Sequence, residues 1–326
     1  MEPFLTRKTL LGGLVIALLV ALGAAFVYDL TPVSGDAQPV VFEIASGTGF
    51  RAVVANLRTA GLVRSTTATE AYMLLTGRAL ALKPGVYRLS ASSWTPEITQ
   101  AIAGAAANET TVTIPEGSNV FQIDAALSQA LVTRPGAIVA LANADHLEGR
   151  LFPDTYDFYT GASATSVVAE FLTNFDAKAA PLFATDTKDE ATDLILASIV
   201  EKEVADPVDQ RMVAGILEKR LAAGMPLDVD ASVCYAKLLA NPSSGATSCP
   251  SLTAADFAID SPYNTYRYKG LPPAPIGNPG ARAIEAVLNP QASPYWYYLS
   301  DPATGKTIYA KTLAEQEANQ KKYLKP

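Results

Sequence analysis

The sequence has little of the side-chain chemistry on which many enzymes and metal proteins depend. Its 326 residues include one histidine, His146, and two cysteines, Cys234 and Cys249. A His/Cys zinc site, a Ser-His-Asp triad and a Cys-His pair would all have to use that single imidazole. His146, next to Asp145, is itself more typical of a surface loop. We therefore expect no metal and no cofactor, and we expect carboxylates, amides and hydroxyl groups to carry the polar chemistry.

Charged residues are also scarce, and their balance is acidic. They make up 17% of the chain, below the ~25% of an ordinary soluble protein. The 25 Lys and Arg residues against 32 Asp and Glu residues give a net charge of −7. That sign is wrong for neutralising nucleic-acid phosphates over a large surface, so nucleic acid is excluded as a partner. Hydrophobic residues reach 49%, and at ~100 to 200 residues per domain the chain has room for two or three folded units.

Part of this apolar excess lies near the N-terminus, where no charge interrupts the chain from Thr9 to Tyr28. This length is enough to cross ~30 Å of hydrocarbon as a helix. Arg7 and Lys8 precede it, so the positive-inside rule predicts a cytoplasmic N-terminus and an exported remainder. A cleaved signal peptide is the alternative, although its apolar region usually runs ~7 to 15 residues. In an oxidising compartment Cys234 and Cys249 could form a disulfide; two free thiols remain the other possibility.

The pattern of turns and apolar periods predicts an α+β protein. Residues 40–104 alternate strands and amphipathic helices as a small module, and a further strand, Gly turn and helix follow over 111–130. EGRLFPDTYDFYTG (148–161) is interrupted by Pro153 and is predicted to be a loop or short extended stretch. Helices are predicted up to Gly224, and near the end a strand pair, YWYYLS and KTIYA, precedes a terminal helix. The predicted organisation is a tail (1–8), a transmembrane anchor (9–29), a linker (30–39), a small domain (40–109) and a mainly helical domain with a short β-hairpin (110–326).

One helix places a carboxylate among apolar residues. In LILASIVEKEV (194–204), Leu196, Ile199 and Val200 form an apolar stripe, and Glu203 lies within it. Glu201 is about 200° round the helix from Glu203, so the two cannot form a glycosidase dyad. Burial of a lone carboxyl raises its pKa, which is the environment of a general acid. The structural alternative is that Glu203 bonds a buried Arg or Tyr and only holds helices together.

Four separated motifs resemble one family. ASIVEKE (197–203), FPDTYDF (152–158), YNTY (263–266) and GLPPAPIGNPG (270–280) occur together, in the order found in the endolytic murein transglycosylases, the MltG or YceG-like family. The resemblance covers nearly the whole chain. It implies an N-terminal membrane anchor, a LysM-like small domain over 40 to about 104, and a catalytic domain closed by the strand pair. It also implies a single-pass protein of the bacterial inner (plasma) membrane, with its catalytic domain in the periplasm or outside the cell.

The resemblance further implies a lyase acting on peptidoglycan glycan strands. The family cleaves the β-1,4 bond between N-acetylmuramic acid and N-acetylglucosamine and leaves a 1,6-anhydromuramoyl end without consuming water. Its catalytic glutamate corresponds to Glu203, in agreement with the helical argument. Because the sugar's 6-hydroxyl is the nucleophile, one carboxyl can act first as acid and then as base. Such an enzyme would terminate or trim growing strands, with penicillin-binding synthases and the elongation machinery as partners.

Other residues are assigned to the substrate groove by position in the motifs. The predicted substrate-binding residues are Tyr263, Asn264, Tyr266, Asp230, Tyr235 and Glu201. The family often has glutamine at position 228, where this chain has Asp228; the extra acid could raise the pKa of Glu203 or simply face solvent. Cys234 and Cys249 are not part of the family pattern.

Two other functions compete with this interpretation. One is a non-catalytic peptidoglycan-binding scaffold for cell-wall synthases. The other is a glycoside hydrolase that pairs Glu203 with Asp154, Asp157 or Asp230, which would require a carboxyl separation of ~5 or ~6.5 to 9.5 Å.

Overall fold

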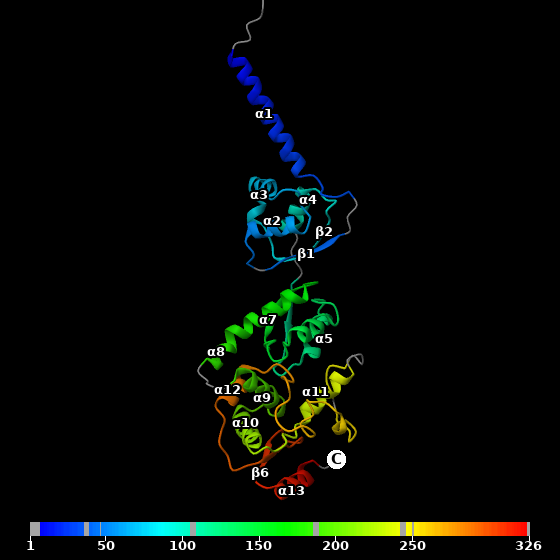
Figure 1. The fold of residues 1–326 in the computed structure, drawn as a ribbon, viewed down its shortest axis with the longest axis vertical. Helices are drawn as coiled ribbons and strands as arrows, with labels where there is room; N and C mark the ends of the chain where they lie inside the picture. Colours follow the sequence, from blue (N-terminus) through cyan, green and yellow to red (C-terminus); the bar gives the residue numbers. More distant parts are fainter. Residues whose placement is uncertain are drawn as a thin grey trace, which may run out of the picture. The chain divides into compact units, whose positions relative to one another are not determined.

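The computed structural model describes residues 7–35, 39–45, 47–104, 109–184, 189–241, 246–249 and 251–324, with side chains from residue 12 onward (Figure 1). The chain divides into two compact units. Unit 1 comprises Met1–Thr110 and Tyr159–Ala162, and unit 2 comprises Thr111–Phe158 and Ser163–Pro326. Within these described residues, helices dominate over three two-stranded sheets, which confirms the predicted α+β class.

Unit 1 begins with the long apolar helix α1 (Arg7–Asp29). Its Gly12–Asp29 segment has a mean hydropathy of 2.0 and no buried residue, so by length and composition it could cross a membrane. The C-terminal end of α1 is held by Arg64, whose guanidinium lies 5.1 Å from the ring centre of Tyr28. Arg64 also donates through Nε to the Thr31 hydroxyl at 3.1 Å. These contacts connect the apolar helix to the folded part of unit 1.

The folded part of unit 1 is built on an antiparallel strand pair. β1 (Val40–Ile44) pairs with β2 (Gly85–Leu89), so that Val40 lies opposite Leu89. The helices of this part are α2 (Phe50–Thr59), α3 (Thr66–Leu75), η1 (Arg78–Leu80) and α4 (Thr95–Gly104). The apolar side of α2 packs into the core, as its period predicts, because Val53, Val54 and Leu57 are each at most 1% exposed. The LysM-like assignment of this module stays a prediction.

From residue 109 onward, the chain contains a larger set of helices and strands. They are β3 (Glu109–Thr113), α5 (Val120–Gln129), α6 (Ala137–Asp145), β4 (Thr155–Tyr159), α7 (Ala164–Lys178), α8 (Ala180–Phe183), α9 (Glu190–Glu203), α10 (Pro207–Ala222), α11 (Asp230–Ala240), η3 (Asp256–Ala258), α12 (Ala281–Leu288), β5 (Tyr297–Ser300), β6 (Thr307–Ala310) and α13 (Leu313–Tyr323). β3 pairs with β4, and β5 pairs antiparallel with β6. The short extended stretch in EGRLFPDTYDFYTG, the terminal hairpin and the last helix are thereby confirmed.

Helix α9 lies at the centre of unit 2, in contact with α10, α11 and α12. The predicted apolar stripe is buried, with Leu196 at 2% and Ile199 and Val200 at 0% exposure. The helix ends at Glu203. A new helix, α10, starts soon afterwards because Asp206 accepts hydrogen bonds from the N–H groups of Val208 and Asp209. The catalytic candidate therefore stands at the C-terminal end of a helix that the core fixes in place.

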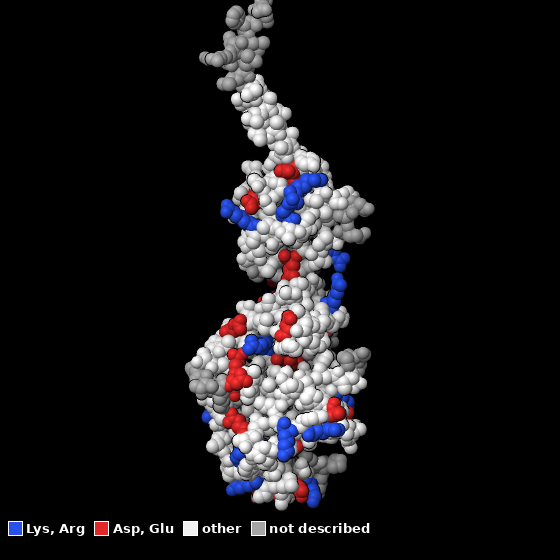
Figure 2. Space-filling model, in the orientation of Figure 1, with Lys and Arg blue, Asp and Glu red and all other residues white. Residues whose placement is uncertain are grey.

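The surface reflects the low charge content. Figure 2 shows basic and acidic side chains intermixed on the visible face, separated by wide uncharged areas. The charged residues visible on that face therefore form small groups of both signs.

Candidate active site

Two sequence motifs come together at the C-terminal end of α9. Each contains a glycine at a point where a neighbouring segment lies too close for any side chain. Gly149 has a φ of +94°, and a Cβ there would lie 2.6 Å from Cγ of Pro275. A Cβ on Gly277 would lie 2.7 Å from the carbonyl oxygen of Gly117. Any side chain would separate these segments. The EGR and GNPG sequences therefore bring the 115–120, 148–151 and 275–280 segments together beside the EKE sequence.

Glu203 lines a cavity of about 450 Å³ at the end of α9. Its carboxyl group is hydrogen-bonded by the hydroxyl of Tyr298, on β5. Burial raises the pKa of Glu203 to about 7, and the nearby charge of Asp230 adds to this, whereas the Tyr298 bond lowers the pKa. Glu203 does bond a tyrosine, as the structural alternative expects. It also lines a cavity with a proton available near neutral pH, which is the property of a general acid.

Asp230 and Tyr266, both predicted as groove residues, meet at the edge of the same cavity. Asp230 is the first residue of α11, and its Oδ1 accepts a hydrogen bond of 2.6 Å from the Tyr266 hydroxyl. The Tyr266 ring is 40% exposed and stands edge-on to Phe257 at 4.8 Å. An exposed, hydrogen-bonded ring of this kind can contact a sugar face.

Asp228 also lines the Glu203 cavity, and its charge is paired. It forms an ion pair with the buried guanidinium of Arg220 on α10. Its φ of +51° places it in the left-handed region, between α10 and α11. The sequence left open whether Asp228 acts on Glu203 or faces solvent; the structure gives its carboxylate a third role, as the partner of Arg220.

Two predicted groove residues have other contacts in the structure. Asn264 is fully buried, and its Nδ2 donates to the carbonyl oxygens of Phe257 and Ile259 at 3.0 and 2.9 Å. Glu201 accepts a 3.0 Å hydrogen bond from the N–H of Gly280. Asn264 thus shapes the YNTY loop, and Glu201 faces the 277–280 segment, away from Glu203 as the helical angle predicts. Neither is among the residues that line the Glu203 cavity.

Tyr235 and Tyr263 lie beside a second carboxyl group, that of the partly buried Glu148. The hydroxyl of Tyr235 donates to Oε2 of Glu148 at 2.8 Å, and the rings of Tyr235 and Tyr263 lie 5.1 Å apart. Oε2 also accepts from the Val120 N–H at 3.0 Å, and Oε1 accepts from Nδ2 of Asn278 at 2.8 Å. Burial raises the pKa of Glu148 to about 7, against the effect of these bonds and of the Lys202 charge.

Sequence reasoning missed Glu148 and Tyr298. Glu148 is the first residue of the EGRLFPDTYDF motif, and Tyr298 belongs to the predicted strand YWYYLS, so both lie in segments that the sequence marked. The signal for Glu148 was the placement of an acid directly before a glycine in that motif. No spacing along the chain connects Tyr298 to Glu203, since the contact depends on how the terminal hairpin packs.

The two aspartates of the 152–158 motif have partners on neighbouring elements. Asp154 is bound by Lys178 and by Nδ2 of Asn174, and these hydrogen bonds hold its pKa at about 2. Asp157 accepts a 2.6 Å hydrogen bond from the Thr111 hydroxyl. Both carboxylates therefore stabilise the surroundings of β4.

The two cysteines form a disulfide, which confirms the pairing that an exported location would allow. It connects Cys234 on α11 with Cys249, 15 residues further along the chain. The same helix therefore provides Asp230 at its N-terminus and this covalent connection one turn later.

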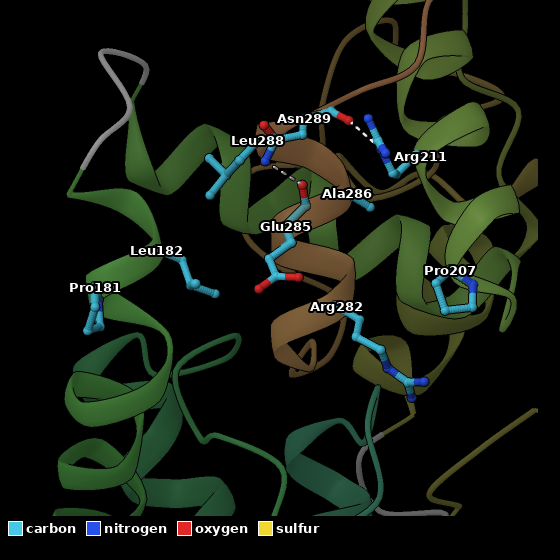
Figure 3. Close-up of a pocket in the computed structure, with 9 residues that line it drawn as sticks. All are labelled: Pro181, Leu182, Pro207, Arg211, Arg282, Glu285, Ala286, Leu288 and Asn289. Atoms are coloured by element: carbon cyan, nitrogen blue, oxygen red, sulfur yellow. Dashed lines mark hydrogen bonds between the residues drawn. The ribbon is translucent and has the colours of Figure 1, made fainter.

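Another cavity, of about 700 Å³, lies between α8, α10 and α12. Figure 3 shows Arg211 reaching toward Asn289, to whose carbonyl oxygen its Nε donates at 2.9 Å. Arg282 pairs with Glu116 at 2.7 Å. Both guanidinium groups of this cavity have protein partners, and Glu203 lies in a different cavity.

Comparison with known proteins identifies the family. A sequence profile described as the YceG-like family matches residues 42–322. An endolytic murein transglycosylase of Bacillus subtilis (strain 168) is 27% identical over 337 residues, covering 93% of this chain and 91% of that protein. One from Streptococcus pneumoniae serotype 2 is 29% identical over 341 residues, covering 91% of this chain but only 61% of that protein.

A solved structure gives the same relationship. The crystal structure of a YceG-like protein from Listeria monocytogenes shares 28% identity and a TM-score of 0.55, and the match covers 87% of this chain and 100% of that one. The family profile alone spans most of the sequence, from the first strand of unit 1 to the terminal helix. The chain belongs to the YceG-like family.

Proposed function

We propose that this protein is a lytic transglycosylase that cleaves the β-1,4 bond between N-acetylmuramic acid and N-acetylglucosamine in peptidoglycan glycan strands. One observation carries the proposal: Glu203, whose pKa is raised to about 7, lines a cavity together with Tyr266 and Asp230. The names of the curated relatives, endolytic murein transglycosylase, support the same reaction. The chain spans 61% of the Streptococcus relative, so its own activity needs a direct test.

The reaction can be completed by one carboxyl group. Protonated Glu203 donates its proton to the glycosidic oxygen as the C1–O4 bond breaks. The carboxylate that remains removes the proton from the sugar's 6-hydroxyl, and O6 bonds to C1 to close the 1,6-anhydro ring. The proton lost in the first step is regained in the second, and no water is consumed. Burial keeps the pKa of Glu203 high enough for the first step, with the Asp230 charge adding to it, and the Tyr298 hydroxyl stabilises the carboxylate for the second.

The location proposed for this reaction is outside the cytoplasm. α1 would anchor the chain in the bacterial inner membrane, with Arg7 and Lys8 on the cytoplasmic side and both units exported. The disulfide on α11 supports an oxidising compartment. Anchored near the sites of strand synthesis, the enzyme would terminate or trim growing strands beside penicillin-binding synthases.

The test is the activity of the full chain with Glu203→Gln, measured on peptidoglycan strands. Gln keeps the size and a hydrogen-bond acceptor for Tyr298 but cannot deliver a proton, so we expect a loss of about 10²-fold or more in cleavage. The matched control is Glu285→Gln, the same change at an exposed residue of the cavity in Figure 3. Strand binding without any cleavage by the wild type would support the scaffold instead, whereas full cleavage by Glu203→Gln would show that another residue is the general acid.

A hydrolase with two carboxyl groups is the second candidate, and one observation favours it. The charge of Asp230 raises the pKa of Glu203, which places a second carboxylate close to the first. In a hydrolase, Asp230 would activate water or attack the sugar. The products distinguish the two enzymes, because hydrolysis leaves a reducing end and transglycosylation leaves an anhydro end.

A further inference from the structure

The folded part of unit 1 exposes large apolar side chains on the elements that lie beside the end of α1. Leu74 and Leu75, at the C-terminal end of α3, are 62% and 81% exposed. Leu80, in η1, is 97% exposed. Trp94, directly before α4, is 45% exposed. These four residues are called the apolar patch below.

Contacts within unit 1 place the elements of the apolar patch together, next to the C-terminal end of α1. Arg78 of η1 donates through Nη1 to the carbonyl oxygen of Pro96 in α4 at 2.8 Å, and α3 contacts both η1 and α4. The N–H of Thr95 donates to the carbonyl oxygen of Leu30 at 3.0 Å, so Trp94 lies close to the end of α1. α1 also contacts α3, and Figure 1 shows α3 at the level at which α1 ends. Exposed apolar side chains that share one side of a protein mark an interaction surface.

We propose that the apolar patch inserts into the surface of the bilayer that α1 spans, so that the folded part of unit 1 rests on the lipid headgroups. This inference rests on the location proposed above, because it requires α1 to be a membrane helix. It goes further than an anchor, since it assigns a lipid-binding surface to the folded part itself. Tryptophan and leucine suit this position, because an indole ring prefers the boundary between headgroups and acyl chains and a leucine side chain prefers the acyl region.

The segment that follows α1 keeps the apolar patch at the bilayer. This segment is predicted to be a linker, but in the structure its first residues are fixed to unit 1. Leu30 is 7% exposed, and the N–H groups of Val33 and Ser34 both donate to the carbonyl oxygen of Ala91, at 2.9 and 3.0 Å. A helix in the membrane therefore holds the patch close to the lipid. The bilayer is the one apolar phase that α1 itself brings to these side chains.

Charge also fits a surface of anionic lipid. Residues 40–104 contain six Lys and Arg against three Asp and Glu, a net charge of 6 − 3 = +3, whereas the whole chain carries −7. One of these cations, Arg64, lies 5.1 Å from the ring centre of Tyr28 near the end of α1, the level at which headgroup phosphates would lie. Figure 2 shows basic side chains on unit 1 close to the point at which α1 leaves it. Anionic headgroups attract such cations, and salt screens the attraction.

The experiment uses the two tryptophans of the chain, Trp94 in the apolar patch and Trp296 in unit 2. The full chain with Trp296→Phe is reconstituted into vesicles of phosphatidylcholine and phosphatidylglycerol, with or without bromine on the upper part of the acyl chains. Bromine quenches an indole ring only at close range. We expect brominated lipid to quench Trp94. The full chain with Trp94→Phe reports Trp296 as the control, which should lose little fluorescence.

Replacing the leucines of the apolar patch should release Trp94 from the lipid. In the Trp296→Phe chain, Asn at positions 74, 75 and 80 removes apolar area from the proposed contact. The ratio of lipid-bound to free patch should then fall by about a hundredfold, measured as a loss of quenching. Leu131→Asn makes the same change at a leucine of unit 2 that is 70% exposed, and it should leave the quenching unchanged. Equal thermal unfolding of these chains shows that each remains folded.

The outcomes separate this inference from the proposed location and activity. An unquenched Trp94, in a chain that alkaline carbonate does not extract from the vesicles, would overturn the inference while the anchor stands. Extraction by carbonate would overturn both the location and the inference. Shielding of Trp94 that increases with the number of chains per vesicle, without quenching by bromine, would identify a second copy as the occupant and overturn the lipid contact. These measurements involve no cleavage, so they do not depend on the role of Glu203.

Discussion

The two units differ in what they bury. Among the described residues of unit 1, the buried polar side chains are three threonines: Thr69, Thr95 and Thr99. Unit 2 buries Asp124, Arg220, Asn264 and Asn278, and it also carries Glu148 and Glu203, each with a pKa of about 7. Both units have an apolar core, so the buried polar groups of unit 2 are additional to its hydrophobic packing.

Removing a carboxyl group from water lowers the stability of the folded state. Such groups are therefore found more often at functional sites than elsewhere. From this difference we expect structural and positioning roles for unit 1 and the chemistry in unit 2. We also expect mutations in one unit to change the stability of that unit alone. In unit 2, the effect of mutating Glu203 should depend on pH.

The largest expected effect is on the core of unit 1. Leu57→Ala removes a fully buried side chain from α2 and should destabilise unit 1 by about 2 to 5 kcal/mol. Amide hydrogen exchange by mass spectrometry should show faster exchange in 40–104 and little change in α9. Cleavage of soluble glycan should persist, because Glu203 and its cavity lie in unit 2. Equal loss of protection in both units would contradict the division.

The next effect concerns the disulfide of unit 2. The bond closes a 15-residue separation, for which chain entropy gives about 3 kcal/mol. Cys234→Ser should therefore lower the unfolding free energy of unit 2 and leave unit 1 unchanged. Thermal unfolding followed by hydrogen exchange locates the change; a shift confined to unit 1 would be the opposite result.

A smaller effect arises from the ionisation of Glu203. Burial raises its folded-state pKa from 4.5 to about 7, so protonation stabilises the folded state. That stabilisation is fully present below about pH 4.5 and is lost as pH rises through 7. Glu203→Gln should consequently be more stable than the wild type at pH 8, by about 1 to 3 kcal/mol, and the gap should close toward pH 4.5. Denaturant unfolding at pH 4.5 and pH 8 measures this difference in unfolding free energy. Glu285→Gln is the control for removing one charge.

The smallest effect is a shift of the pH profile. Asp230 raises the pKa of Glu203 and the Tyr298 bond lowers it. Asp230→Asn should therefore move the alkaline fall in kcat/KM to lower pH, and Tyr298→Phe should move it to higher pH, each by up to about one unit. Shifts in the same direction would show that another group sets the profile. Arg88→Gln, in unit 1, should leave the profile where it is.

Much of the fold follows from local patterns. Clear hydrophobic periods mark the strand pairs near both ends of the chain, the buried face of α2 and the apolar stripe of α9. Asp206 followed by Pro207 marks the start of a helix. The helices α6, α11 and α12 were not predicted. They are 8 to 11 residues long, and their formation depends on packing against unit 2.

The site was predicted in part. The period of α9 places Glu203 correctly on a partly buried face, because helical geometry is local. Tyr298 and Glu148 contact residues far apart in the sequence, so no spacing rule indicates those contacts. The Arg220–Asp228 pair is local but depends on the turn between α10 and α11. Asn264 and Glu201 belong to the motifs but bond backbone groups, which a motif alone cannot distinguish from contact with a ligand.

We propose that unit 2 breaks glycan strands with one carboxyl group and without water. The most direct measurement is mass spectrometry of the products formed from defined glycan strands in H₂¹⁸O. We expect 1,6-anhydro ends that contain no ¹⁸O, and loss of these products in Glu203→Gln. Reducing ends that carry ¹⁸O would contradict it and would identify a hydrolase.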